Sequence, residues 1–177
     1  MATSADELKV VYMDEVHCIA NFMDIQISIS RGEPGIAFLE QSIRLLRASA
    51  KEYPKGVGLL IVISADAPPP SEAAREHIKK GLIQLSGVLK GAARVIEGQG
   101  FTSAAKRSAL SLLDLLLRMP YPTKIFGSTS EASVWLVQSL GAAPHRRYNP
   151  THLVHAVENL RKLHDTRMPR AQPAGRA

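Results

Sequence analysis

The chain has 177 residues, of which 45% are hydrophobic and 21% charged, as is usual for a single globular domain. Its longest aliphatic run, Val57–Ile63, is far shorter than the roughly 20 residues that cross a bilayer. The N-terminal "MATSADELKV" lacks the basic and apolar parts of a secretion signal. A single cysteine, Cys18, excludes an internal disulfide framework. We therefore expect a cytoplasmic protein with no transmembrane segment.

The net charge of +6 is concentrated towards the C-terminus. Residues 144–177 carry seven Lys and Arg against two Asp and Glu, whereas residues 1–143 are almost balanced. The folded part therefore lacks an obvious basic stripe, and we predict no specific nucleic-acid interface. Residues 168–177 have no apolar periodicity and are predicted to form a disordered basic tail, either solvated or in weak contact with an acidic surface. We expect truncation at His164 to leave the melting temperature nearly unchanged.

Two strands and a turn are predicted in the N-terminal part. The apolar runs Val10–Ile19 and Asp24–Ser30 flank the turn "NFMD", and "RGEPG" ends the second run. A helical period follows as far as "YPKG". Val57–Ile63 is then a continuous aliphatic run, which is typical of a strand covered on both faces. The apolar stripe of the predicted helix consists of Ile36, Leu39, Ile43, Leu46 and Ala50.

The middle of the chain continues the alternation of helix and strand. Ser71 is predicted to cap a second helix, a short strand follows over Ala92–Ile96, and a third helix covers Thr102–Met119. The second helix has the apolar stripe Ala74, Ile78, Leu82, Leu85 and Leu89.

The last strand and helix carry the sharpest local signals. A strand is predicted over Thr123–Phe126, and Ser128 with Glu131 three residues later forms a capping box that opens a helix. Gly141 ends that helix.

An added helix is predicted over Asn149–His164. Asn149 is a good cap and Pro150 suits the first helical position. The apolar stripe is narrow and needs a surface on which to dock. Its members are Leu153, Ala156 or Val157, Leu160 and Leu163.

This order predicts an α/β fold with a mostly parallel sheet of four to five strands, helices packed on it, and an added C-terminal helix. We divide the chain into an α/β domain over residues 1–143, a helical extension over 144–167 and the tail.

The element order, the central strand "GLLIVIS" and the final unit "TKIFGSTSEASVWL" resemble the STAS superfamily, whose name joins sulfate transporters and anti-sigma factor antagonists. Within it, the chain is most similar to the SpoIIAA-like branch, over about residues 10–141. The resemblance implies the fold given above, a non-enzymatic regulatory role, and a protein partner. In regulatory members, a loop of the type Asp-Ser-Ser/Thr-Gly is phosphorylated by a partner kinase.

Here the corresponding loop reads "SADAPPPS", which makes Ser64 and Ser71 the candidate phosphoacceptors. Three prolines fix the backbone φ angles and remove three N–H donors that could have bound an anion. A phosphate-binding loop is therefore disfavoured, and capping is the simpler role for Ser71.

No catalytic set is evident in the sequence. "GQGFTS" lacks the third glycine and the acidic residue of a dinucleotide site, so an ordinary turn is favoured. His152, His155 and Glu158 share a predicted helix but lack a further ligand with suitable spacing. Asp14 and His17 fall on the first predicted strand, where we expect neighbouring side chains to diverge. We predict no catalytic, metal or cofactor site.

Three functions remain open. The first is a regulatory or scaffolding domain that binds proteins. The second is a carrier or sensor of an apolar small molecule or lipid, which the SpoIIAA-like branch also suggests. An enzyme comes third.

We also predict a homodimer. The Thr102–Met119 helix has an apolar arc wider than one face of a sheet requires. A second subunit could cover the surplus row, as could a neighbouring helix or a ligand. The candidate interface residues are Leu112, Leu115 and Leu116.

Overall fold

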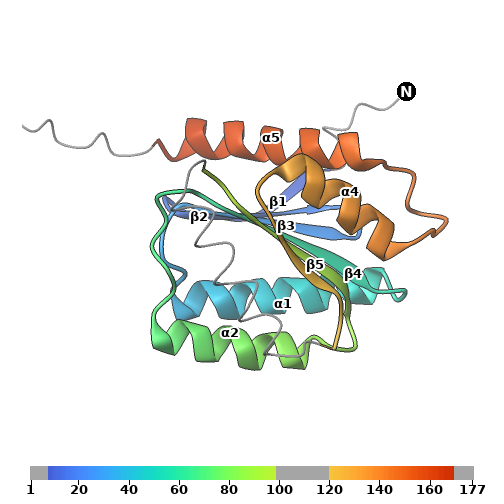
Figure 1. Ribbon diagram of the computed structural model, residues 1–177, viewed down its shortest axis with the longest axis horizontal. Helices are drawn as coiled ribbons and strands as arrows, with labels where there is room; N and C mark the ends of the chain where they lie inside the picture. The colour runs from blue at the N-terminus through green and yellow to red at the C-terminus, as the bar shows by residue number, and fades with distance from the viewer. Residues whose placement is uncertain (1–7, 99–119, 170–177) are drawn as a thin grey trace, which may run out of the picture.

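A six-stranded sheet lies between two helical layers in the computed structural model, which describes residues 8–98 and 120–169 (Figure 1). Helices α1 and α2 cover one face, and α4 and α5 cover the other. The bounds are α1 Ile36–Glu52, α2 Glu72–Gln84, α4 Thr129–Leu140 and α5 Pro150–Arg167. The predicted Thr102–Met119 helix lies outside the described residues, and so do Leu112, Leu115 and Leu116.

The strands follow one another across the sheet in chain order. The first two pairings are antiparallel, and the three that follow are parallel. The strands are β1 Leu8–Met13, β2 His17–Phe22, β3 Ile25–Ser30, β4 Val57–Ile63, β5 Leu89–Ile96 and β6 Thr123–Phe126.

The strand count of four to five was wrong, because the predicted strand Val10–Ile19 is two strands. The Asp14 carboxylate accepts the backbone N–H groups of Val16 and His17 at 2.8 and 2.6 Å, and this local turn separates β1 from β2. The predicted stripe of the second helix was also wrong at Leu89, because α2 ends at Gln84 and Leu89 is the first residue of β5.

Two hydrophobic clusters hold the layers together. The larger one joins α4 and α5 to the sheet and includes Ile27 and Leu60. The smaller one joins α1 and α2 to β4 and β5 and includes Leu46 and Leu59. Alternate residues of β4 thus enter opposite clusters, as predicted for a strand covered on both faces.

The face of α1 that packs on the sheet is not the predicted apolar stripe, although Leu46 belongs to both. Phe38 stacks on His17 with ring centroids 4.0 Å apart, and Ser42 bonds Gln26, so the row of Phe38, Ser42, Leu46 and Ser49 faces the sheet. Ile36, in contrast, is 46% exposed.

Ile43 packs beside Gly81 of α2 and against the smaller cluster. A Cβ added at Gly81 of α2 would come within 2.2 Å of the Ile43 side chain. Glycine at this position therefore permits α1 and α2 to approach closely.

The residues predicted to cap α2 and α4 are confirmed, but the capping box predicted for α4 is only half formed. The Ser71 hydroxyl accepts the Ala74 N–H at 3.3 Å, and the Ser128 hydroxyl accepts the Glu131 N–H at 3.3 Å. The Glu131 carboxylate accepts the Ser128 hydroxyl rather than the backbone N–H of a complete capping box. Gly141 ends α4 with a φ of 67°.

Helix α5 begins as predicted and packs on α4 and on the edge of the sheet that contains β1 and β2. The Asn149 side chain accepts the His152 N–H at 3.0 Å, and Pro150 occupies the first turn. The buried stripe ends at His164, whereas Leu163 is half-buried, because the helix continues to Arg167 along the sheet.

Within residues 8–98 and 120–169, none of the helices combines the length and the apolar character that a membrane span requires.

Replacing Leu160 tests the packing of α5. Leu160 is fully buried, so Leu160→Asp places a carboxylate in the cluster shared by α4, α5 and the sheet. We expect the free energy of unfolding to fall by about 3 kcal/mol or more. Urea unfolding measures the loss, and the exposed Thr166→Asp is the matched control, with an expected change below about 0.5 kcal/mol. Equal stabilities would contradict the docking of α5.

Candidate functional site

The carboxyl edge of the parallel strands gathers both candidate phosphoacceptors. Strands β3, β4 and β5 end there, and α1, α2 and α4 begin there. Ligands of parallel α/β sheets usually bind at this edge.

Ser64 lies directly after β4 and is only 5% exposed. Its N–H donates to the Ser30 carbonyl at 2.9 Å, and its own carbonyl accepts the Ala67 N–H at 3.1 Å. A kinase would therefore reach the Ser64 hydroxyl only after the loop opened.

Ser71 is exposed but already engaged. Its hydroxyl caps α2, and its backbone N–H donates to a Glu33 carboxylate oxygen at 2.9 Å. Hydrogen bonds from the side chain and backbone of Ser71 lower the pKa of Glu33. A phosphate on Ser71 would lie beside the Glu33 carboxylate, and the two negative charges would repel each other. Phosphorylation of Ser71 stays a prediction.

The loop residues Pro68–Pro70, which we call the proline arm, lead into this cap. Pro68 and Pro69 are exposed, whereas Ala67 before them is buried. The arm is therefore fixed at both ends, by Ala67 and by the Ser71 cap.

Asp14 organises a second polar cluster at the same edge, and here the sequence prediction was wrong. Asp14 and His17 do not diverge, because the turn after β1 brings Asp14 Oδ1 within 3.6 Å of His17 Nδ1. The Tyr12 hydroxyl also donates to Asp14. Although burial raises the pKa of Asp14, the hydrogen bonds from Tyr12 and the turn amides lower it further than burial raises it.

Asp14, His17 and Ser30 have the residue types of a hydrolase triad, since Ser30 lies opposite His17 in the β2–β3 register. Their geometry does not activate a nucleophile. The Ser30 hydroxyl donates to the Gly32 carbonyl at 2.9 Å, and the His17 ring is buried against Phe38. In this geometry the three residues belong to a packed cluster beside α1.

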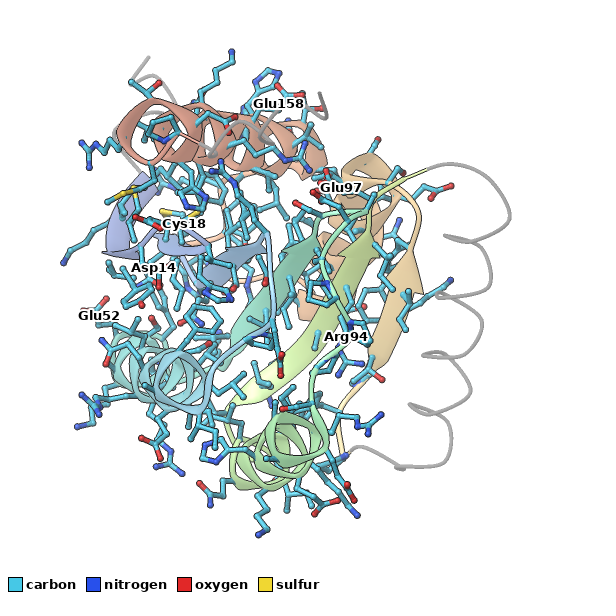
Figure 2. All side chains as sticks on the ribbon, turned by 90° about the vertical axis from the view of Figure 1, so that its left-hand side faces the viewer. Asp14, Cys18, Glu52, Arg94, Glu97 and Glu158 are labelled. Atoms are coloured by element: carbon cyan, nitrogen blue, oxygen red, sulfur yellow. The ribbon has the colours of Figure 1, made fainter. Side chains whose placement is uncertain are left out.

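Cys18 points to the opposite face, into the cluster beneath α5 (Figure 2). Burial raises the pKa of its thiol to about 12, so the side chain stays protonated and unreactive.

Side-chain hydrogen bonds tie the C-terminal half of α5 to the carboxyl edge of the sheet. Arg31 donates to Asp165 at 2.5 Å and to the Met168 carbonyl at 3.1 Å. Arg161 donates to Glu97, after β5, and to Thr129 at the start of α4. Truncation at His164 would therefore remove both partners of Arg31, and we place the cut after residue 169 instead.

The histidines of α5 do not converge on a site. His155 and Glu158 are exposed, and His152 Nδ1 accepts the Asn149 N–H at 3.4 Å. Throughout the described ranges, no three His, Cys, Asp or Glu side chains are placed to hold a metal ion.

The amino edge of the sheet holds a cluster that the sequence did not predict. Asp24, in the β2–β3 turn, is completely buried. Its carboxylate accepts the Tyr148 hydroxyl at 2.5 Å and Arg146 Nε at 2.5 Å, and it lies 3.0 Å from His145 Nε2. Burial raises the pKa of Tyr148 first, and its hydrogen bond to Asp24 raises it further, so this hydroxyl remains a donor.

Arg146 also caps α4 by donating to the carbonyls of Leu140 and Gly141, and it reaches the Gly56 carbonyl at 3.3 Å. Each strong donor near Asp24 thus has an acceptor within the protein. This arrangement fixes the connection between α4 and α5 against the amino edge of the sheet.

The chain is similar to one solved structure, that of an uncharacterized protein from the DUF3478 family with a SpoIIAA-like fold, from Shewanella loihica PV-4. The two share 16% identity over 77% of this chain and 98% of that one, with a TM-score of 0.49. No family model and no curated protein matches the chain. SpoIIAA-like is the branch that the sequence resembles, but a likeness of this degree carries no function with it.

The buried histidines predict a pH dependence. Burial lowers the pKa of both His17 and His164, so the unfolded chain binds protons before the folded chain does as the pH falls. The stability that depends on keeping these two histidines neutral is therefore present above about pH 6.5 and is lost as the pH falls below it.

Thermal unfolding of the His164→Gln variant tests this. Glutamine can still donate to the Asp14 carbonyl, which His164 Nε2 approaches at 2.7 Å, but it does not titrate. We expect the loss of melting temperature between about pH 7 and pH 5 to shrink. The exposed His155→Gln is the control and should keep the full loss; the same loss in all three proteins would contradict a role for His164.

The charge beside Ser71 predicts the response to a phosphate mimic. Ser71→Asn keeps a capping oxygen and should be nearly neutral, whereas Ser71→Asp adds a carboxylate next to Glu33. We expect Ser71→Asp to be less stable than Ser71→Asn in urea unfolding, and Glu33→Gln to remove the difference. Equal stability of Ser71→Asp and Ser71→Asn in the Glu33 background would show that this repulsion is negligible.

Proposed function

We propose that the chain is a non-enzymatic regulatory or scaffolding domain that acts by binding a protein partner. One observation carries the proposal. Several of the charged side chains that the structure describes at the carboxyl edge, where an α/β enzyme would do its chemistry, are engaged in contacts within the protein. These contacts are Glu33 with Ser71, Arg31 with Asp165, and Arg161 with Glu97.

Part of the described surface at this edge is apolar, and its backbone is restrained. The bond between Glu33 and Ser71 holds the segment before α1 beside the segment before α2. Ile36 lies three residues after Glu33 and the proline arm lies directly before Ser71, so we infer that they form one exposed surface, which we call the edge surface. Because proline fixes φ, ordering this surface against a partner costs little conformational entropy.

The proline arm also has a polar requirement. Its residues lack backbone N–H groups but keep their carbonyl oxygens as acceptors. A partner that offers apolar contact together with hydrogen-bond donors, such as Tyr or Trp side chains, would match it.

Native mass spectrometry of the protein purified from its own host tests the proposal. We expect a protein complex, which Pro68→Ser, Pro69→Ser and Ile36→Ser together should abolish. The matched control is Ile83→Ser, which removes an equally exposed isoleucine from the far end of α2.

A mass twice that of the chain would make the partner a second copy, as predicted for a homodimer. A complex that survives the triple substitution would move the interface away from the edge surface. A monomer carrying a small apolar molecule would overturn protein binding and favour the carrier.

A further inference from the structure

Strand β3 presents opposite chemistry to the two helical layers. Its isoleucines 25, 27 and 29 face α4 and α5, whereas Gln26, Ser28 and Ser30 face α1. All six are buried. A helix that packs on a sheet normally meets an apolar face, so a buried polar layer beneath α1 requires hydrogen-bond partners.

The helix meets this need only in part. Gln26 Nε2 donates to Ser42 Oγ at 3.0 Å, which fixes the amide and leaves Gln26 Oε1 for another donor. Asn21 lies directly opposite Gln26 in the antiparallel β2–β3 register, so the two side chains share one face and adjoin each other.

Several polar atoms of this layer have no partner. Among the residues that the structure describes, six buried side-chain polar atoms lack a hydrogen bond, and four of them lie between α1 and strands β2 and β3. Gln26 is 1% exposed and Ser49 4%, so bulk solvent does not reach them. These four atoms are His17 Nε2, Asn21 Oδ1, Gln26 Oε1 and Ser49 Oγ.

We propose that the layer is an internal water site, in which one ordered water molecule donates one hydrogen to Asn21 Oδ1 and the other to Gln26 Oε1. Two neighbouring amide oxygens need donors, and water carries two. Buried water typically makes about three hydrogen bonds to such groups. Ser49, two turns after Ser42 on the same face of α1, provides a hydroxyl to the same layer.

A water molecule shared by two amides predicts a specific mutational pattern. Asn21→Leu should lower the melting temperature by about 2–4 °C, because Gln26 Oε1 then loses its bridge. Replacing both residues by leucine should cost less than the sum of the single changes, since no orphaned amide is left. If neither a water molecule nor a direct amide–amide hydrogen bond joins the two residues, each amide oxygen is an independent liability, and Asn21→Leu should leave the melting temperature unchanged or raise it. The crystal structure separates the water bridge from the direct bond.

Ser133→Ala is the matched control. Ser133 Oγ is equally buried and unpartnered, but it lies on α4, away from the polar layer. Its removal should not lower the melting temperature beyond the small effect of one hydroxyl.

A crystal structure of the unmodified full chain, at a resolution that shows ordered water, tests the site directly and does not depend on the folding of any variant. Density between Asn21 and Gln26, together with non-additive losses, is the expected result. Dry packing between the two amides, or additive gains in stability, would overturn the proposal.

Discussion

The buried carboxylate of Asp24 is the constraint on which the rest of the structure depends. It lies in the tight turn between β2 and β3, where Met23 adopts a φ of 51° that a side chain other than glycine adopts at a cost. Tyr148 and Arg146, from the connection between α4 and α5, supply its partners. A buried charge is stable only with such donors. Displacing the connection between α4 and α5 would therefore leave the Asp24 carboxylate buried without hydrogen-bond partners. The path of α5 across the sheet follows from that requirement.

Charged side chains at both edges of the sheet hold helix α5 in place. At the amino edge, the Asp24 cluster fixes one end of α5. At the carboxyl edge, two ion pairs hold the other end of α5. Arg31 pairs with Asp165 of α5, and Arg161 of α5 pairs with Glu97. Side chains engaged in these ion pairs stabilise the position of α5 and are not free to bind a substrate. This use of charge is consistent with our proposal that the carboxyl edge binds a protein partner through the exposed Ile36 and the proline arm.

The two helical layers also differ in how they are held. Helices α4 and α5 pack on isoleucine, leucine and valine, whereas α1 meets β3 through Ser42 and Gln26. An apolar layer gains stability from burial in proportion to its area, while a polar layer gains only if each group finds a partner. Hydrophobic periodicity alone could not reveal this difference. The apolar row of α1 that it identified lies partly between α1 and α2, where Ile43 meets Gly81.

The sequence by itself determined the elements whose signals are local. Val57–Ile63 and Thr123–Phe126 have the predicted bounds, and Ser71, Ser128 and Asn149 cap the helices as expected, because a cap acts within three or four residues. The break at Asp14 was also local but was hidden in an apolar run. Tertiary structure alone decided the polar clusters, because Tyr148 is 124 residues from Asp24 and His164 is 150 from Asp14. No periodicity joins such residues, since they meet only when the packing of α5 removes water from both.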